Sequence, residues 1–203
     1  MPKTELIMQR YYSNVYWHFT GGPKVDWSTI MMPKEIKNKA KPCIEAVDIL
    51  KKILTSKKLI AGCTERINKE LSTEKFCCVC DIPFKDLIYH AEYYGKVAIG
   101  FSATSIHRKF NPVLYMDRGF HSSFYSGNLK QFIKLTRFSE NPEETFYRER
   151  EWRSIEGDFY FIQSDIEAII VPEQYFYEIK EYISMLGFNK DIPIIPFEFI
   201  EKA

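Results

Sequence analysis

Short apolar segments of strand length recur along the chain, and they restrict the fold more than any other feature of its sequence. They are rich in the aromatic and β-branched residues that favour strands, and they cover residues 15–19, 75–83, 96–103, 111–117, 166–172 and 191–200. Apolar residues spaced three or four apart predict helices between them, at residues 42–54, 84–95, 128–137 and 173–188. Strands that outnumber interspersed helices predict an α+β fold.

The length and the composition fit one globular domain. The chain has 203 residues, 45% hydrophobic and 27% charged, and we expect a single domain over residues 1–203 because no repeat or linker divides it. The formal net charge of +1 gives no electrostatic case for nucleic-acid binding by the chain as a whole.

The cysteines and the hydropathy indicate a cytoplasmic protein with free thiols. Three of the five cysteines stand at 77, 78 and 80, and neighbouring cysteines on a strand pair poorly because they point to opposite faces. The first residues, MPKTELIMQRYY, hold no long apolar core, and no stretch approaches the roughly 20 apolar residues of a membrane span. The run CCVC offers three crowded sulfurs rather than the usual four spaced zinc ligands, so we expect no metal site.

Residues 21–42 predict a long loop. They contain three prolines and a run of lysines that includes Lys34, Lys37, Lys39 and Lys41, and they allow one short helical turn. Loops of this length are usually functional or mobile. Because this one directly follows the strand at 15–19, we expect a mobile lid over any pocket there.

The stretch VYWHFTGG places two polar side chains in an apolar strand. His18 and Thr20 are two residues apart, so on a strand they point the same way. They would line the floor of a ligand pocket. The alternative is a core strand in which the histidine is hydrogen-bonded at an edge and the glycines form a turn.

Two other segments carry polar residues where the pattern would allow apolar ones. On the helix at 84–95, His90 and Tyr94 share a face; this face either packs in the core or stacks on a planar ligand. In YREREWRSI, an extended chain would put Glu149, Glu151 and Arg153 on one side. Such a row is either a solvated edge strand or a functional set of charges.

These segments, in order, resemble the AbiGi family of abortive phage-resistance proteins. The resemblance runs from about residue 14 to 172, and it is carried by Asp81-Ile82-Pro83, His90 with Tyr94-Gly95, Gly100-Phe101, Asn111-Pro112-Val113 with Tyr115, and Glu149 with Glu151-Trp152-Arg153. Family membership implies a role in bacterial defence as the antitoxin of an abortive-infection pair. A cognate toxin or another defence protein is therefore an expected partner.

A more distant resemblance is to ADP-ribosyltransferases of the DarT-like kind. An early His-x-Thr strand, aromatic residues midway and a late glutamate strand are similar to that layout, which implies mixed sheets flanked by helices, NAD as substrate and nucleic acid among the acceptors. Carried over, His18 positions the NAD ribose, Thr20 lies beside it and Glu151 is the catalytic carboxylate. Tyr94 and Tyr115 compete, with Tyr93, for the middle position in the cofactor site.

The chemistry of NAD cleavage is consistent with these residues. Breaking the nicotinamide–ribose bond passes through an oxocarbenium-like cation, which a nearby carboxylate stabilises. Arg153 or Arg150 would hold the pyrophosphate, and Lys24 and Trp27 of the loop would close over the dinucleotide.

Three functions follow from the sequence, and each predicts a different structure. An NAD-dependent ADP-ribosyltransferase requires His18, Thr20 and Glu151 to converge on one concave pocket. A non-catalytic antitoxin or partner-binding module requires Glu151 to pair with Arg153 or Arg148 at the surface, with no pocket near His18. A nucleic-acid-binding regulator requires a basic patch, for which only the lysines of the loop at 21–42 are available.

Overall fold

The computed structural model describes residues 13–68, 71–119, 127–188 and 191–202. Most of the expected strands form where the sequence places them. The strands are β1 (Val15–Phe19), β2 (Lys58–Leu59), β3 (Cys77–Cys80), β4 (Ala98–Ser102), β5 (Asn111–Pro112), β6 (Leu114–Asp117), β7 (Ile133–Thr136), β8 (Glu151–Ser154), β9 (Phe159–Tyr160), β10 (Ile166–Val171) and β11 (Ile194–Pro196). The helices are α1 (Cys43–Ser56), α2 (Leu87–Tyr94), α3 (Ala103–Ile106), α4 (Phe176–Met185) and α5 (Phe197–Ile200).

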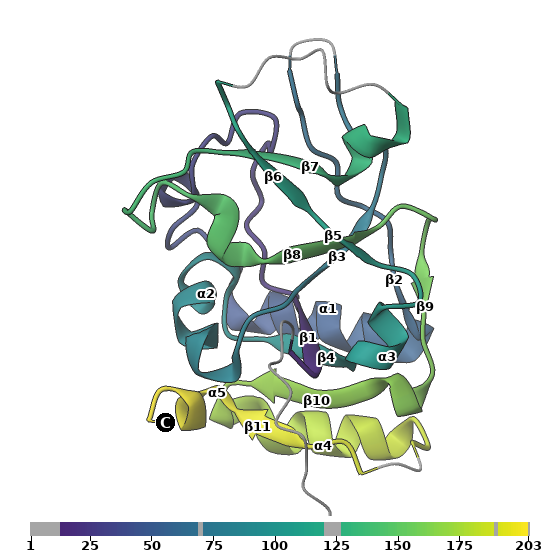
Figure 1. Cartoon of the computed structure of the whole chain (residues 1–203). Helices are drawn as coiled ribbons and strands as arrows, with labels where there is room; N and C mark the ends of the chain where they lie inside the picture. The colour runs from purple at the N-terminus through teal and green to yellow at the C-terminus, as the bar shows by residue number, and fades with distance from the viewer. Residues whose placement is uncertain (1–12, 69–70, 120–126, 189–190, 203) are drawn as a thin grey trace, which may run out of the picture.

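A mixed sheet organises the described part of the chain. Its strand order is β11-β10-β4-β1-β3-β8-β5, and only β10 and β11 pair in parallel. Two smaller pairs, β2 with β9 and β6 with β7, lie beside it. Figure 1 shows β6 and β7 at the top, above β8, and α4 and β11 at the bottom. The α+β fold, with a mixed sheet flanked by helices, is thus confirmed.

Two apolar clusters cover the two faces of this sheet. Alternate strand residues point to opposite faces, so Ile169 packs with the buried faces of α1 and α4, whereas Ile170 packs with α2 and α5. Gly100 in β4 has a packing reason: a Cβ there would lie 2.6 Å from Val15 and 2.8 Å from the ring of Trp17. The indole of Trp17 therefore lies directly on the β4 backbone.

Three expectations for local structure are wrong. Residues 128–137, predicted as a helix, form a 3₁₀ helix (Gly127–Phe132) followed by β7; Ile133 and Leu135 alternate with polar residues and are buried as strand residues. Residues 191–200 form a strand only to Pro196, after which the chain turns into α5. The strand at 111–117 breaks at Val113 because β5 pairs with β8 whereas β6 pairs with β7.

The loop at 21–42 contains one short 3₁₀ helix, Pro33–Glu35, as its composition suggested. Backbone hydrogen bonds anchor it at three points: Lys34 N–H to Glu143, Asn38 N–H to Glu92, and Lys41 N–H to Gly21, each 2.9 Å. The loop thereby connects β1 to α1 while contacting the C-terminal end of α2.

Candidate functional site

A cavity of about 330 Å³ lies where β1, β3, β8 and the loop at 21–42 meet. His18, Thr20, Tyr94, Glu151 and Arg153 all line it, although they come from segments far apart in the sequence. The residues chosen from the sequence therefore converge, with the exception of Tyr115. The volume is near the lower end of the range for ligand pockets.

His18 contributes a hydrogen-bond acceptor to this cavity. Its Nδ1 lies 2.9 Å from the carbonyl oxygen of Cys78, and because a carbonyl only accepts, Nδ1 carries the proton. Burial lowers the pKa of His18, and the Cys78 carbonyl opposes this effect only in part. The imidazole is therefore neutral near pH 7, with Nε2 as an acceptor.

Thr20 is buried at the end of β1, and its hydroxyl is likewise an acceptor. Thr20 Oγ1 donates its proton to the carbonyl of Ala46, 2.8 Å away in α1, so its remaining lone pairs can only accept. The next residue, Gly21, is held against α2: a Cβ at this position would lie 2.6 Å from the backbone oxygen of Tyr94. This contact explains why a small residue follows Thr20.

Glu151 lies in a buried network of charges on β7 and β8. Its Oε1 accepts from Arg153 Nε at 2.8 Å, and its Oε2 accepts from Lys134 Nζ at 2.8 Å and from Arg153 at 3.3 Å. Burial alone would raise the pKa of Glu151, but Arg153 and Lys134 hold it at about 2. The carboxylate is ionised at neutral pH, and three of its roughly four acceptor positions are used.

Glu149 lies on the other side of the same lysine. Its Oε2 is 2.8 Å from Lys134 Nζ, and its Oε1 accepts a hydrogen bond from the Tyr94 hydroxyl. Burial raises the pKa of Glu149; Lys134 opposes this effect and the Glu151 carboxylate adds to it. The two carboxylates thus differ: Glu151 stays charged, and Glu149 is the one suited to exchanging a proton.

Arg153 lies beneath the cavity with no exposed surface. Its five N–H groups donate to Glu151, to Glu65 and to the backbone carbonyls of Gln131 and Ile133. Arg150 pairs with Asp81 at 2.8 Å. The N–H groups of Arg153 are therefore not available for a pyrophosphate as expected, and Arg153 instead positions Glu151. Arg150 is not among the residues that line this cavity.

Tyr115 also differs from its expected place. It lies on β6, outside the residues that line the cavity, because the chain changes sheets after Pro112. The Tyr115 hydroxyl accepts a hydrogen bond of 2.8 Å from the backbone N–H of Glu151. Tyr115 therefore stabilises β8, the strand that carries Glu151. Of the tyrosines expected in the cofactor site, Tyr94 is the one that lines the cavity.

Aromatic rings form one wall of the cavity. Phe19 lies against His90 (4.6 Å between ring centroids), His90 stacks on Tyr94 (4.5 Å), and Tyr94 lies parallel to Trp27 of the loop (6.4 Å). Burial, with Arg148 and Lys134, lowers the pKa of His90 to about 3, so the ring is neutral. This wall offers stacking surface to a planar ligand group.

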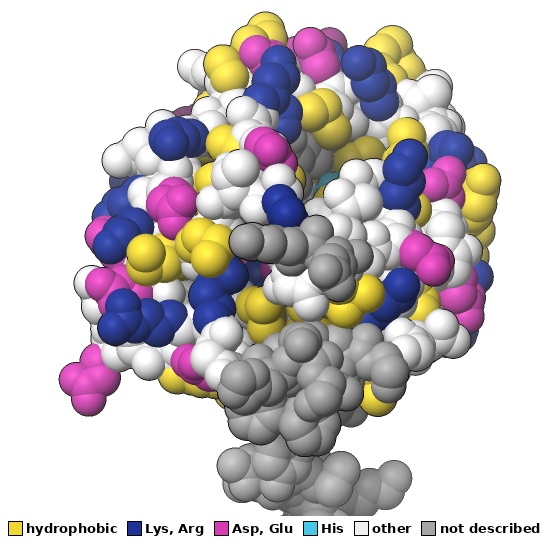
Figure 2. All heavy atoms as spheres, turned by 90° about the horizontal axis from the view of Figure 1, so that it is seen from above, with side chains coloured by type: hydrophobic (Ala, Val, Ile, Leu, Met, Phe, Trp, Pro, Cys, Tyr) yellow, Lys and Arg dark blue, Asp and Glu magenta, His cyan; other side chains and the backbone are white. Residues whose placement is uncertain are grey.

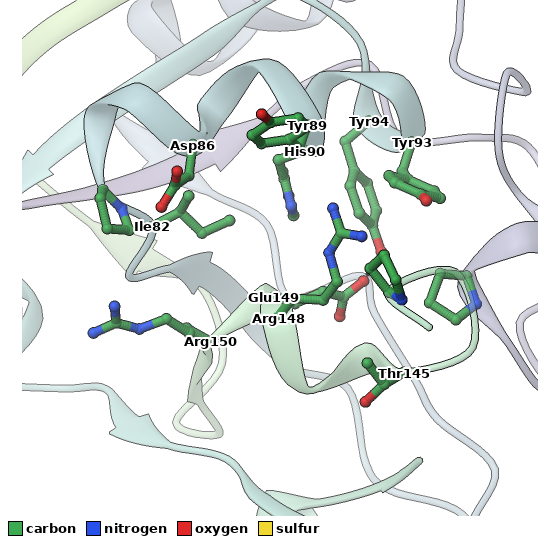
Figure 3. Close-up of a pocket in the computed structure, with 13 residues that line it drawn as sticks. Ile82, Asp86, Tyr89, His90, Tyr93, Tyr94, Thr145, Arg148, Glu149 and Arg150 are labelled. Carbon is green, nitrogen blue, oxygen red and sulfur yellow. Dashed lines mark hydrogen bonds between the residues drawn. The ribbon is translucent and has the colours of Figure 1, made fainter. Parts of the chain in front are cut away.

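A second, larger groove of about 510 Å³ lies behind this wall. Figure 3 shows its two sides, with Tyr89, His90, Tyr93 and Tyr94 of α2 above and Arg148, Glu149 and Arg150 below. His90, Tyr94 and Glu149 line both spaces. The Tyr94–Glu149 hydrogen bond is thus part of the partition between them.

The sequence did not reveal several members of the site. Lys134 was hidden in a predicted helix, although the alternation in Ile-Lys-Leu-Thr at 133–136 is a strand signal. Glu65 lies in a segment without regular pattern, and Glu149 lies two residues before Glu151 in a segment whose spacing does not distinguish the two carboxylates. Within the described residues, no cluster of three or more His, Cys, Asp or Glu side chains could hold a metal ion.

Three of the four candidate loop lysines have partners within the protein. Lys34 faces Glu144 at 3.8 Å, Lys37 lies between Glu92 (3.1 Å) and Glu143, and Lys41 donates to the carbonyl of Gly22. Figure 2 shows basic and acidic side chains interspersed over the face seen from above. Two of the four lysines on which a nucleic-acid-binding regulator would depend, Lys34 and Lys37, are therefore paired with carboxylates.

These observations define an α+β protein with a pocket lined by neutral acceptors, stacked rings and a buried carboxylate pair. A family model described as abortive phage resistance protein AbiGi, antitoxin, matches residues 47–198. The chain belongs to the AbiGi family, which confirms the resemblance drawn from its motifs. Among the described residues, no helix is long and apolar enough to cross a membrane.

Comparison with other known proteins adds the following. No curated protein matches the sequence. Two solved structures of DarT from Thermus sp. 2.9 do match: the complex with carba-NAD+ is 14% identical with a TM-score of 0.45, covering 90% of this chain and 95% of that one. The complex with NAD+ is 12% identical with a TM-score of 0.43, covering 89% and 93%. At these scores the likeness supports no conclusion about activity.

Proposed function

We propose that this AbiGi-family protein acts in phage defence by cleaving the nicotinamide–ribose bond of NAD and transferring ADP-ribose to an acceptor. The observation that carries the proposal is the meeting of His18, Thr20 and Glu151 at one cavity. His18 Nε2 and Thr20 Oγ1 are both acceptors, and they match two hydroxyl donors of a ribose. The wall of Tyr94 and Trp27 offers a stacking surface for the nicotinamide ring.

Glu151 supplies the charge that the reaction needs. Its carboxylate is ionised, and it stabilises the cationic sugar that forms as the bond to nicotinamide breaks and the bonding electrons leave with the ring. Lys134 and Arg153 fix the position of this carboxylate by hydrogen bonds. The acceptor nucleophile then forms the new bond to the sugar, and Glu149 takes its proton.

The test compares NAD consumption by the purified parent, by Glu151→Gln and by Glu156→Gln, with and without DNA, RNA or phage lysate. Glu156 is a matched control because its side chain is 69% exposed and lies 3.7 Å from a surface lysine. We expect Glu151→Gln to lower turnover about 100-fold or more and Glu156→Gln to leave it unchanged. If the parent neither binds nor consumes NAD, this function is wrong.

A second candidate is a non-catalytic antitoxin that binds a cognate toxin. Two observations favour it: the family description names an antitoxin, and Lys134 and Arg153 already occupy most of the acceptor positions of Glu151. Its two structural expectations are not met, because Glu151 is buried and a cavity lies at His18. This function predicts that the parent and Glu151→Gln bind the purified toxin equally well. Titration of the purified pair distinguishes it from the enzyme.

A further inference from the structure

Two cysteine sulfurs lie in contact at the cavity wall. Cys63 Sγ and Cys78 Sγ are 4.0 Å apart, and both residues line the cavity of about 330 Å³. Cys63 follows β2 and forms an antiparallel bridge with Phe76, through hydrogen bonds of 3.2 and 2.9 Å. Cys78 lies two residues beyond Phe76, and its side chain therefore points to the same face.

The backbone thus holds the two thiols near each other. A disulfide has an S–S bond of about 2.05 Å and closes readily only between residues whose backbones are already close. The bridge at Phe76 and the diagonal position of Cys78 provide this arrangement. Closing the bond requires the segment at Cys63 to move toward β3.

The other three cysteines lack these properties. Cys77 points into the core, where its thiol donates to the carbonyl of Leu59 at 3.2 Å and burial raises its pKa to about 11. Cys80 lies 3.7 Å from His90, and burial raises its pKa well above the usual value. Cys43 is at the start of α1, and no thiol contact joins it to another cysteine.

Cys63 has the reactivity expected of an attacking thiol. It is exposed, whereas Cys78 is half-buried. The hydrogen bond with Cys78 lowers the pKa of Cys63, although burial opposes the effect, and the same contact raises the pKa of Cys78. A thiolate that is accessible and next to a second thiol is the arrangement of redox-sensitive cysteines.

The position of this pair couples it to the carboxylate network. Two residues after Cys63, Glu65 forms an ion pair with Arg153, and Arg153 holds Oε1 of Glu151. Cys78 lies on β3, where it is directly opposite Arg153 of the neighbouring strand β8. A movement of Cys63 toward Cys78 therefore displaces Glu65 and removes two thiols from the cavity wall.

We propose that Cys63 and Cys78 are an oxidation site that closes into a disulfide at the cavity wall and weakens ligand binding there. With oxidised glutathione, the Cys63 thiolate attacks one sulfur and releases one glutathione thiolate. Cys78 then attacks the mixed disulfide at the Cys63 sulfur, releases the second glutathione thiolate and gives up its proton to it. The two protein thiols lose two electrons and two protons, and one glutathione disulfide becomes two thiols.

Peptide mapping tests the bond directly. The reduced protein is treated with oxidised glutathione, its remaining thiols are blocked with N-ethylmaleimide, and tryptic peptides are analysed by mass spectrometry. We expect the peptides of Cys63 and Cys78 to be joined with the loss of two hydrogens, reversibly with dithiothreitol. The link is absent in Cys63→Ser and Cys78→Ser and is retained in Cys43→Ser and Cys80→Ser. Stable glutathionylation of Cys63 without a bond to Cys78, or a link to another cysteine, overturns the proposal.

NAD binding to the reduced and oxidised forms tests the effect on the cavity, and this arm alone rests on the proposed function. We expect at least tenfold weaker binding after oxidation, and no change on the same treatment of Cys63→Ser. Equal affinity of the two forms overturns the effect on the cavity. If the reduced protein does not bind NAD, the proposed function fails, whereas the peptide map still decides whether the bond forms.

Discussion

The guanidinium of Arg153 is fully buried, and every one of its N–H groups donates within the protein. It also lies 4.2 Å from the ring centroid of Phe76. A buried charge is tolerated only when it is paired and hydrogen-bonded in this way. The arginine therefore has a structural task, which is to hold Glu151 and Glu65 in place, and its pKa is raised by these carboxylates despite burial.

Replacing Arg153 by alanine leaves Glu151 and Glu65 without this partner. Removing one member of a buried ion pair typically costs about 3–5 kcal/mol, so we expect a loss of this order in the free energy of unfolding, measured by urea denaturation. Arg137→Ala is the control: its side chain is 65% exposed and 3.9 Å from Glu144, and we expect a change within about 0.5 kcal/mol. Similar values for the two variants would contradict the structural role of Arg153.

The elements differ in how well the sequence predicts them. Helices α1, α2 and α4 carry several turns of apolar spacing, and β1, β4 and β10 are long apolar runs, so all six were predicted. β7 was not, because four residues of alternation are outweighed by a neighbouring helix-like pattern. This error hid Lys134. By contrast, His18 and Tyr94 lie on correctly predicted elements, Thr20 directly follows one, and Glu151 lies in the segment considered as an extended chain; all four line the cavity.

Long-range contacts account for the rest of the site. The pairing of Cys63 with Phe76 and of Glu65 with Arg153 joins segments whose spacing in the sequence carries no periodic signal. The break at Val113, which takes Tyr115 out of the cavity, depends on which strand each half of the segment meets. Which strands and side chains pair at these positions depends on tertiary packing and not on local propensity.

The packing of β1 on β4 leads to a prediction at Gly100. An alanine there would place its Cβ 2.6 Å from Val15 Cγ1 and 2.8 Å from the Trp17 ring, so these two side chains must shift. Overpacking of this kind typically costs about 1–3 kcal/mol. In Gly62→Ala, by contrast, the nearest atom is 3.8 Å away, and we expect no loss of stability. Thermal unfolding followed by circular dichroism compares the two variants, and a Gly100→Ala protein as stable as Gly62→Ala would contradict the described packing.

At the scale of the whole molecule, a few buried charges connect elements that are otherwise separate. Lys134 of β7 bridges Glu149 and Glu151, Arg153 of β8 bridges Glu151 and Glu65, and Tyr94 of α2 hydrogen-bonds Glu149. The network therefore spans both cavities and the β6–β7 pair. Its protonation state affects the stability of the fold as well as the chemistry of the site.

We expect the free energy of unfolding to decrease in acid because Glu151 becomes protonated. Its pKa is lowered from 4.5 to about 2 in the folded state, so as the pH falls the unfolded chain binds this proton first. The stabilisation is present above pH 4.5 and is lost as the pH falls to about 2, which corresponds to roughly 3 kcal/mol in the free energy of unfolding. Glu149 acts in the opposite sense: its pKa is raised, so its contribution is present below its usual pKa and is lost as the pH rises through the raised value.

Urea denaturation at a series of pH values measures this dependence, and two variants assign it. Glu151→Gln removes the titrating group, so we expect its stability to fall less steeply in acid than that of the parent. In Glu156→Gln the lost carboxylate is 69% exposed and lies 3.7 Å from Lys109, and we expect the steep acid loss to persist. If Glu151→Gln retains the full acid dependence of the parent, the low pKa does not belong to Glu151, and the carboxylate is not held ionised by Lys134 and Arg153 as the geometry requires.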